Sequence, residues 1–232
     1  MNIFAQILKK DKNKVYKPHF SPIFMGREEI MISERLKKLN ELKKLDVNPY
    51  PSKFLVKNHS SDLQVKYKDL VNAEKTKDKA VIAGRVLNIR DLGKIAFAKL
   101  KDPYGEIQIV IQEGDTDKKT IEFFKKYLDS GDIIGVEGII FRTQRGELSV
   151  LVKNIEMLSK SLLTFPEKFH GLKDEEEKLR KRYLDILLND EIKEMFYRKT
   201  KFWSIMRNFF VDNGFIEVET PVLENSAGGA AA

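Results

Sequence analysis

The sequence contains no cysteine and only three histidines, and these absences exclude several kinds of site. Without cysteine the chain can form no disulfide, no cysteine-ligated zinc site and no thiol nucleophile. His19, His59 and His170 are far apart in the sequence, which argues against a histidine-based metal site. No apolar run approaches the roughly 20 residues that a membrane helix needs. The apolar start of the chain is followed by lysines instead of a cleavage site for a signal peptidase. We therefore expect a cytoplasmic protein with no membrane partner and no metal ligand.

The charge of the chain narrows the classes of partner. Of the 232 residues, 42 are Lys or Arg and 35 are Asp or Glu, which gives a formal net charge of +7. A positive surplus of this kind is typical of proteins that bind nucleic acid or an anionic surface, although it says nothing about the fold. The length allows one large domain or two small ones.

Residues 1–30 show no regular pattern. Pro18 and Pro22 interrupt any helix or strand there, and Met25 or Met31 could be the true start. We expect a disordered extension or a start assigned too early.

Residues 31–75 predict one helix and a linker. Ser33 is a suitable N-cap, and leucines then recur at helical spacing until Asn48–Pro51. The lysines between these leucines either contact RNA or form a solvated face.

Residues 76–160 predict a small β-barrel. Five runs have the composition of strands: Val81–Arg90, Ile95–Lys101, Glu106–Gln112, Asp132–Thr143 and Glu147–Leu158. An amphipathic helix, Lys118–Asp129, separates the third run from the fourth, and Gly131 follows it. Three strands, a helix and two strands is the order of an OB-fold, a five-stranded barrel that binds single-stranded nucleic acid.

Residues 161–232 have a different pattern. Asn189 and Asp190 predict the start of a long apolar helix that Gly214 ends, and Ile216–Glu219 alternates as a strand before Pro221. One helix and one strand cannot build a core alone, so we expect more sequence after residue 232. The predicted fold class is α+β: an N-terminal helix, the OB-fold barrel, and the start of a further domain.

Three stretches resemble class II lysyl-tRNA synthetases. They are Phe169–Asp174 (FHGLKD) with Arg182–Asp185 (RYLD), then Gly214–Pro221 (GFIEVETP), and finally Gly228–Ala232 (GGAAA). The RYLD part is shared with aspartyl and asparaginyl enzymes, whereas FHGL is more typical of the lysyl branch. GFIEVETP is similar to motif 1 of the class, and GGAAA resembles the loop at the lysine pocket. Ala227 departs from the family, in which many members have proline.

The resemblance, which covers about residues 33–232, implies a lysine–tRNA ligase that uses ATP and Mg²⁺ and whose partners are tRNA-Lys and a second subunit. The ATP-binding motifs and magnesium ligands of the family would follow residue 232. We therefore assign no catalytic, ATP-binding or metal-binding residue here, and we expect the 232-residue chain alone to be inactive. By resemblance, Pro221 lies at the dimer interface and Gly228 lines the lysine pocket.

Four residues of the barrel match the positions with which the family reads a uridine-rich anticodon: Arg90, Phe97, Gln108 and Glu147. A phenyl ring can stack on an unpaired base, an amide can pair with a base edge, and a carboxylate can accept the uracil N3–H. Lys94, Lys99 and Lys101 could hold phosphates.

Each of these residues also has an ordinary structural interpretation. Phe97 could lie in the core, because hydrophobic residues surround it on both sides. Glu147 could be a solvated carboxylate after a glycine turn, Arg90 could pair with Asp91, and the lysines could serve solubility alone. Gln108 alternates with isoleucines and is expected to face outward.

Two other functions fit the same sequence. One is a non-catalytic tRNA-binding protein that consists of the barrel without the enzyme. The other is an aspartyl- or asparaginyl-type synthetase, against which Phe169–Gly171 and the Gly-Gly-Ala run argue.

Overall fold

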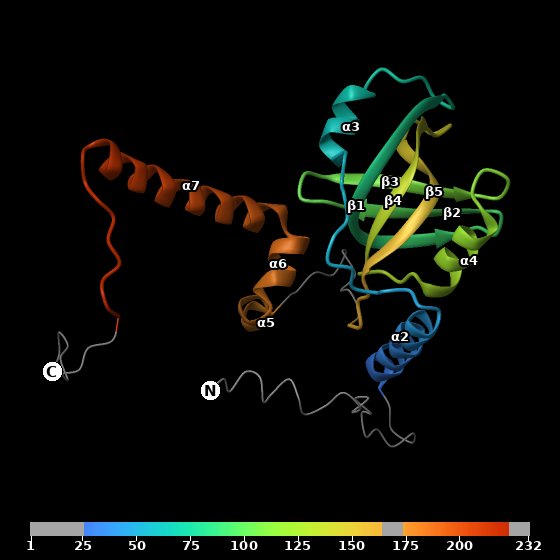
Figure 1. Cartoon of the computed structure of the whole chain (residues 1–232), viewed down its shortest axis with the longest axis horizontal. Helices are drawn as coiled ribbons and strands as arrows, with labels where there is room; N and C mark the ends of the chain where they lie inside the picture. The colour runs from blue at the N-terminus through green and yellow to red at the C-terminus, as the bar shows by residue number, and fades with distance from the viewer. Residues whose placement is uncertain (1–25, 164–173, 223–232) are drawn as a thin grey trace. The chain divides into compact units, whose positions relative to one another are not determined.

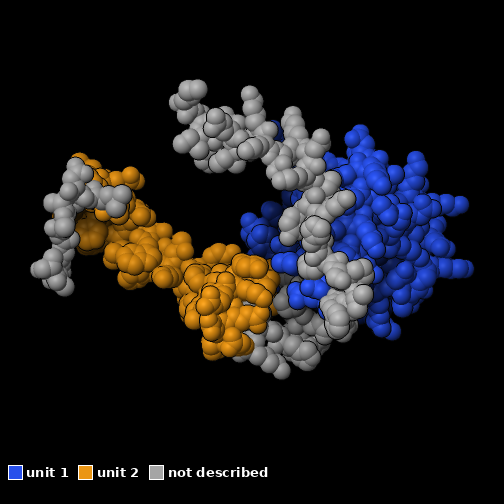
Figure 2. Space-filling view, turned by 90° about the horizontal axis from the view of Figure 1, so that it is seen from below, with its two compact units in different colours: residues 1–165 blue, residues 166–232 orange. Residues whose placement is uncertain are grey.

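The computed structural model describes residues 26–163 and 174–222. The chain divides into two compact units, residues 1–165 and 166–232, coloured separately in Figure 2. The predictions for residues 1–25, His170 and Gly228 fall outside the described residues.

The first unit is built on the predicted barrel (Figure 1). Its elements are α2 (Arg27–Lys44), α3 (Ser60–Lys66), β1 (Lys75–Asp91), β2 (Ile95–Lys101), β3 (Glu106–Gln112), α4 (Lys118–Tyr127), β4 (Ile133–Arg142) and β5 (Leu148–Ser159). The strands close in the order β1-β2-β3-β5-β4, so the prediction of a five-stranded OB-fold barrel is confirmed. The short seven-residue α3 is an element that the sequence pattern did not predict.

The barrel closes through one parallel contact. β3 pairs with β5 in parallel through Gln108 and Ser149, Ile109 and Val150, and Val110 and Leu151. All other pairings between these five strands are antiparallel. Closure leaves none of the five strands as a free edge of the sheet.

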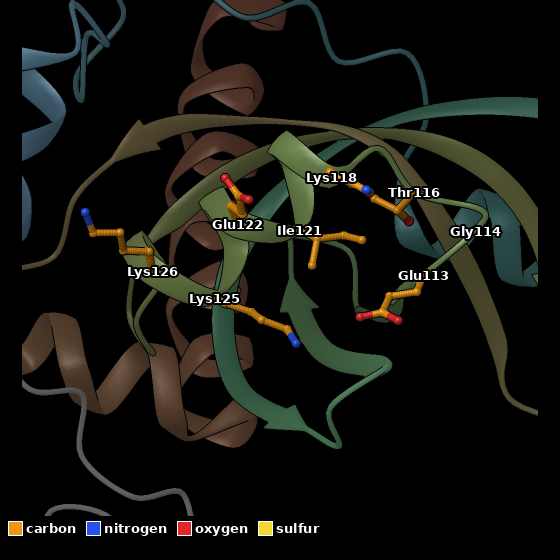
Figure 3. Close-up of a pocket in the computed structure, with 8 residues that line it drawn as sticks. All are labelled: Glu113, Gly114, Thr116, Lys118, Ile121, Glu122, Lys125 and Lys126. Atoms are coloured by element: carbon orange, nitrogen blue, oxygen red, sulfur yellow. The ribbon is translucent and has the colours of Figure 1, made fainter.

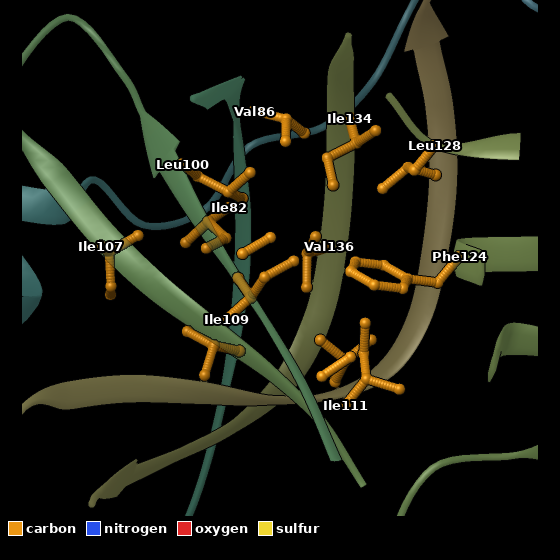
Figure 4. Close-up of a cluster of buried hydrophobic side chains, with 14 of the residues drawn as sticks. Ile82, Val86, Leu100, Ile107, Ile109, Ile111, Phe124, Leu128, Ile134 and Val136 are labelled. Carbon is orange, nitrogen blue, oxygen red and sulfur yellow. The ribbon is translucent and has the colours of Figure 1, made fainter. Parts of the chain in front are cut away.

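The interior of the barrel is filled by branched aliphatic side chains (Figure 4). Phe124 and Leu128, from α4 and its C-terminal end, are buried in the same cluster, so α4 covers the core at one end of the barrel. Helix α4 ends at Tyr127, slightly before the predicted end at Asp129. Gly131 lies in the following turn with φ +99°, a conformation that favours glycine.

Helix α2 begins earlier than its sequence pattern predicted. It starts at Arg27, where the Glu29 carboxylate accepts a hydrogen bond from the Gly26 N–H. Ser33, the expected N-cap, is inside the helix and donates to the Ile30 carbonyl. The prediction of the helix start was therefore wrong, because a glycine with an acidic residue three positions later served as the cap.

A buried ion-pair cluster fixes the end of β5. Lys160 Nζ lies 2.5 Å from Asp129 and 2.7 Å from Asp132, and the side chains of Lys160 and Asp132 are fully buried. Lys160 also donates to the Tyr127 carbonyl, and Lys38 of α2 contacts Asp129 at 2.6 Å. Burial raises the pKa of Asp132. Burial also opposes the charge of Asp129, but hydrogen bonds from Lys160 and Lys38 outweigh it and lower that pKa. The cluster joins α2, α4 and the end of β5.

The Asp102 carboxylate joins two segments that are distant in the sequence. It accepts hydrogen bonds from the Ser60 N–H and hydroxyl at the start of α3, and from the N–H groups of Tyr104 and Gly105 in the β2–β3 turn. Burial opposes ionisation of this carboxyl, but the hydrogen bonds outweigh it and hold its pKa below the usual value.

The described part of the second unit begins with three helices. They are α5 (Glu175–Arg180), α6 (Arg182–Leu188) and α7 (Asp190–Asp212). Asn189 caps α7 as predicted, with its side chain accepting from the N–H groups of Glu191 and Ile192, and Gly214 follows the helix with φ +85°. The predicted strand Ile216–Glu219 is absent, since no described segment pairs with it. Among the described residues, no helix is long and apolar enough to cross a membrane.

We predict that Lys160→Met destabilises the barrel by about 3 to 5 kcal/mol, the usual cost of removing one partner of a buried ion pair, because it leaves Asp132 buried without its cation. Urea unfolding followed by far-UV circular dichroism measures the change. The fluorescence of Trp203, the single tryptophan, reports α7 separately. Lys119→Met, at an exposed position of α4, is the control. Equal loss in the two variants would contradict the prediction.

A second prediction concerns the dependence of the stability of the barrel on pH. Because the pKa of Asp102 is lowered in the folded protein, its contribution to stability is present above the unfolded pKa of about 3.9 and is lost as the pH falls through the folded value. Asp102→Asn should therefore destabilise the barrel at pH 7 by about 1 to 3 kcal/mol. It should also flatten the fall in stability between pH 5 and pH 2. Asp62→Asn, at an exposed position of α3, should change neither quantity.

Candidate nucleic-acid interface

The alternation of β2 decides which residues face outward. Ala96, Ala98 and Leu100 are buried in the core cluster, so Phe97 and Lys99 point to the outside of the barrel. Phe97 is half-buried there. The interpretation of Phe97 as a core residue is therefore wrong, and the ring is placed on the outer surface.

Strand pairing brings three of the four predicted residues together. Arg90 of β1 pairs with Phe97 of β2, and Phe97 pairs with Val110 of β3. In the adjacent row, Lys99 pairs with Gln108, which in turn pairs with Ser149 of β5. We call the outward residues Arg90, Phe97, Lys99, Gln108 and Glu147 the strand face.

Glu147 joins the strand face through β5. It lies directly before Leu148, where β5 begins, and its N–H donates to the Thr143 hydroxyl across the β4–β5 turn. Gln108 Nε2 donates to Ser149 Oγ at 3.0 Å, and that hydroxyl donates to the Glu147 carbonyl at 3.1 Å. These two hydrogen bonds connect the Gln108 amide to the Glu147 backbone.

The two charged ends of the strand face are available for a ligand. Arg90 and Glu147 are exposed, and neither side chain forms an ion pair with any residue that the structure describes. The expected alternative for Arg90 was a pair with Asp91. Asp91 instead lies 3.7 Å from Lys125 of α4 and accepts a hydrogen bond from the Gly93 N–H.

The lysines near the strand face are partly neutralised. Lys99 Nζ lies 3.1 Å from the Glu106 carboxylate, and Lys101 also has an interaction partner. Lys94 is exposed in the β1–β2 turn. The local positive charge is therefore smaller than the count of lysines suggests.

A separate hollow of about 920 Å³ lies beside α4 (Figure 3). Its lining mixes lysines with acidic residues: Glu113, Gly114, Thr116, Lys118, Ile121, Glu122, Lys125 and Lys126. Two of these lysines are engaged, since Lys125 donates to the Gly93 carbonyl and Lys126 lies 2.8 Å from Glu41. The hydrogen bond to Glu41 raises the pKa of Lys126. None of the four predicted residues lines this hollow, so we do not place the site there.

The described residues contain no cluster of metal-ligating side chains. No group of three or more His, Asp or Glu side chains among them could hold a metal ion. We assign no chemical step to the described residues.

Sequence reasoning missed Ser149. It pairs with Gln108 only because β3 and β5 run in parallel, a contact between residues 41 positions apart. The signal that could have marked it is a polar residue inside the hydrophobic run Leu148–Val152. Pro221 is exposed near the end of the described residues, and nothing described contacts it in a way that tests its predicted role.

Comparisons with known proteins agree with the geometry. Residues 80–158 match the family model of the OB-fold nucleic acid binding domain, and residues 174–232 match that of class II tRNA synthetases (D, K and N). The chain is 41% identical to the lysine–tRNA ligase of Fervidobacterium nodosum over 198 residues, which are 85% of this chain and 38% of that protein. It is 45% identical to lysine–tRNA ligase 2 of Methanosarcina mazei over 199 residues, which are 85% and 38% of the two chains. It is 42% identical to the Dehalococcoides mccartyi lysine–tRNA ligase over 206 residues, which are 88% and 41%.

The chain thus spans about two fifths of the length of the curated relatives that it matches. It combines an OB-fold nucleic acid binding domain with a class II tRNA synthetase segment, and most of its length is similar to lysine–tRNA ligases.

Proposed function

We propose that the barrel recognises the anticodon of a lysine tRNA through the strand face. The whole protein then acts as a lysine–tRNA ligase, which joins lysine to that tRNA with ATP. The observation that carries the proposal is the register of Arg90, Phe97 and Gln108. These three residues come from three neighbouring strands and share one outward surface. A row of this kind suits a single strand of RNA with splayed bases.

Four residues of the strand face each have a distinct chemical task. The half-buried Phe97 ring stacks on an unpaired base, an interaction worth roughly 1 to 3 kcal/mol per base. Gln108 offers an acceptor and a donor to a base edge, and the exposed Glu147 carboxylate accepts the N3–H of a uracil. Arg90 supplies a guanidinium plane or a charge for a base or a phosphate.

The lysines contribute affinity without reading sequence. Lys94 directly precedes β2 and Lys101 ends it, and we propose that both contact the RNA backbone. Phosphate contacts of this kind weaken as salt rises. Since Lys99 is paired with Glu106, the salt dependence should be modest and the strand face should carry most of the selectivity.

In the proposed reaction, lysine is activated with ATP to an adenylate and the lysyl group passes to the terminal adenosine of the tRNA. We propose ATP and Mg²⁺ for this reaction from the similarity to lysine–tRNA ligases. Gly228 is proposed as part of the lysine pocket, where the lack of a side chain allows close approach. We place the activity in the cytoplasm.

We also propose that two copies associate through α7 and the segment that leads to Pro221. No residue of α7 is buried, and it exposes large apolar side chains: Met195, Phe202, Trp203, Ile205, Met206, Phe209 and Phe210. A continuous apolar surface of this kind marks an interaction site. Phe215 folds back on Phe210, with the rings 5.5 Å apart, and extends the surface beyond the helix.

Anticodon binding can be tested with RNA stem-loops. The chain should bind a loop with the UUU anticodon more tightly than a loop with an aspartate anticodon, at both low and high salt. Phe97→Ala should weaken UUU binding by roughly fivefold to a hundredfold, because the stacking platform is lost. Fluorescence anisotropy titration measures both effects.

Phe123→Ala is the matched control for this titration. Phe123 is also half-buried but lies on α4, so its loss should not change the preference for UUU. Equal and steeply salt-sensitive binding of the two loops would overturn the proposal, because only the basic surface would then be at work.

Association through α7 predicts a concentration-dependent dimer. The double variant Phe202→Ser with Phe209→Ser should shift the chain to monomer in sedimentation velocity experiments, since it removes two exposed rings from the helix. Lys199→Ser, also exposed on α7, should leave the dimer intact. A wild-type chain that stays monomeric up to the highest soluble concentration would contradict the proposal.

A further inference from the structure

Ser149 is a fully buried hydroxyl within the binding surface. Its neighbours Leu148 and Val150 belong to the core cluster, so the alternation of β5 places Ser149 on the outer side, beneath Gln108. A buried hydroxyl is expected to be hydrogen-bonded, and Ser149 is bonded twice. It accepts from Gln108 Nε2 at 3.0 Å and donates to the Glu147 carbonyl at 3.1 Å.

The direction of these two hydrogen bonds fixes the Gln108 amide. A carbonyl oxygen only accepts, so the single proton of Ser149 is used on Glu147 and its oxygen can then only accept from Gln108. Gln108 must therefore turn its NH₂ group toward Ser149. In the opposite orientation the Ser149 hydroxyl would donate to the Gln108 side-chain oxygen, and its hydrogen bond to the Glu147 carbonyl would be lost. One orientation thus has one more hydrogen bond than the other.

The orientation of this amide matters for a base edge. Uracil and cytosine have the same shape, but uracil presents N3–H and the O4 acceptor where cytosine presents the N3 acceptor and an amino group. An amide held in one orientation has its carbonyl oxygen and its remaining N–H at fixed positions along the base edge. This arrangement matches the donor and acceptor of only one of the two bases. To pair with the other base, the amide would have to rotate by half a turn.

We infer that Ser149 is a positioning residue that sets the selectivity of Gln108 for uracil over cytosine. The inference rests on the proposed binding of the anticodon by the strand face. Ser149 acts through Gln108 and does not touch the RNA. Recognition of the base therefore depends on the parallel β3–β5 contact that closes the barrel, because this contact places Ser149 next to Gln108.

The test compares Ser149→Ala with the wild-type chain. Both are titrated with the UUU stem-loop and with three loops in which one uridine is replaced by cytidine. At one position the preference for uracil should fall by about twofold to tenfold, the equivalent of one net hydrogen bond. At the other two positions the preference should not change. Ser130→Ala is the matched control, because that hydroxyl also donates to a carbonyl, of Leu87, but lies in the turn after α4.

A second arm shows whether Ser149 acts through Gln108. In a Gln108→Ala background, Ser149→Ala should have no further effect on the ratio of uracil to cytosine binding. An unchanged ratio in Ser149→Ala overturns the inference, as does an equal loss of affinity for all four loops. Failure of the wild-type chain to distinguish UUU from an aspartate anticodon instead overturns the proposed function.

A third arm needs no variant at position 149. The side-chain NH₂ protons of Gln108 are followed by NMR, with Gln108→Glu used to assign them. One of the two protons should exchange with solvent more slowly than those of Gln144, which is exposed in the β4–β5 turn. Equal exchange at both glutamines overturns the inference even where Ser149→Ala does not fold.

Discussion

The parallel pairing of β3 with β5 is the contact on which the rest of the first unit depends. Only three residue pairs form it, from Gln108 with Ser149 to Val110 with Leu151. Without it the five strands would be an open sheet with two edges, and the core would lose one wall. The same contact places β5 next to β3 on the outer surface. Closure of the barrel and assembly of the strand face are therefore one structural event.

Much of the fold could be predicted because its signals are local. β2 and β3 have the predicted bounds, since each alternates clearly and the turn Asp102–Gly105 separates them. The start of α2 could not be placed from Ser33, because a glycine and an acidic residue gave an earlier cap. Helix α3 is too short for a periodic signal, and a carboxylate 42 positions from Ser60 anchors it. Ile216–Glu219 has the composition of a strand, but composition does not supply a partner.

The residues of the candidate site also differ in whether a local sequence pattern could place them. Gln108 could be assigned to the outer surface from its alternation with isoleucines alone. Phe97 could not, because Ile95, Ala96, Ala98 and Leu100 are all hydrophobic and only the register shows which of them fill the core. Ser149 depends on a contact between distant strands, which no local pattern encodes. The positive charge that Lys99 offers to RNA could not be judged from the sequence either, since its pairing with Glu106 is a tertiary contact.

The Asp102 carboxylate has a consequence for how the chain tolerates changes in length. It fixes the start of α3 to the β2–β3 turn, while Asn58 is fixed to β1 by its hydrogen bonds with Val81. The path of the chain is thus pinned at residues 58–60, independently of how α2 is held at the other end of the barrel. The stretch 48–56 between these attachments is spanned by no helix or strand. Because α2 and α3 are attached to the barrel separately, an insertion in this stretch that leaves the hydrogen bond from the Tyr50 hydroxyl to the Lys160 carbonyl in place should lengthen the loop without moving either helix.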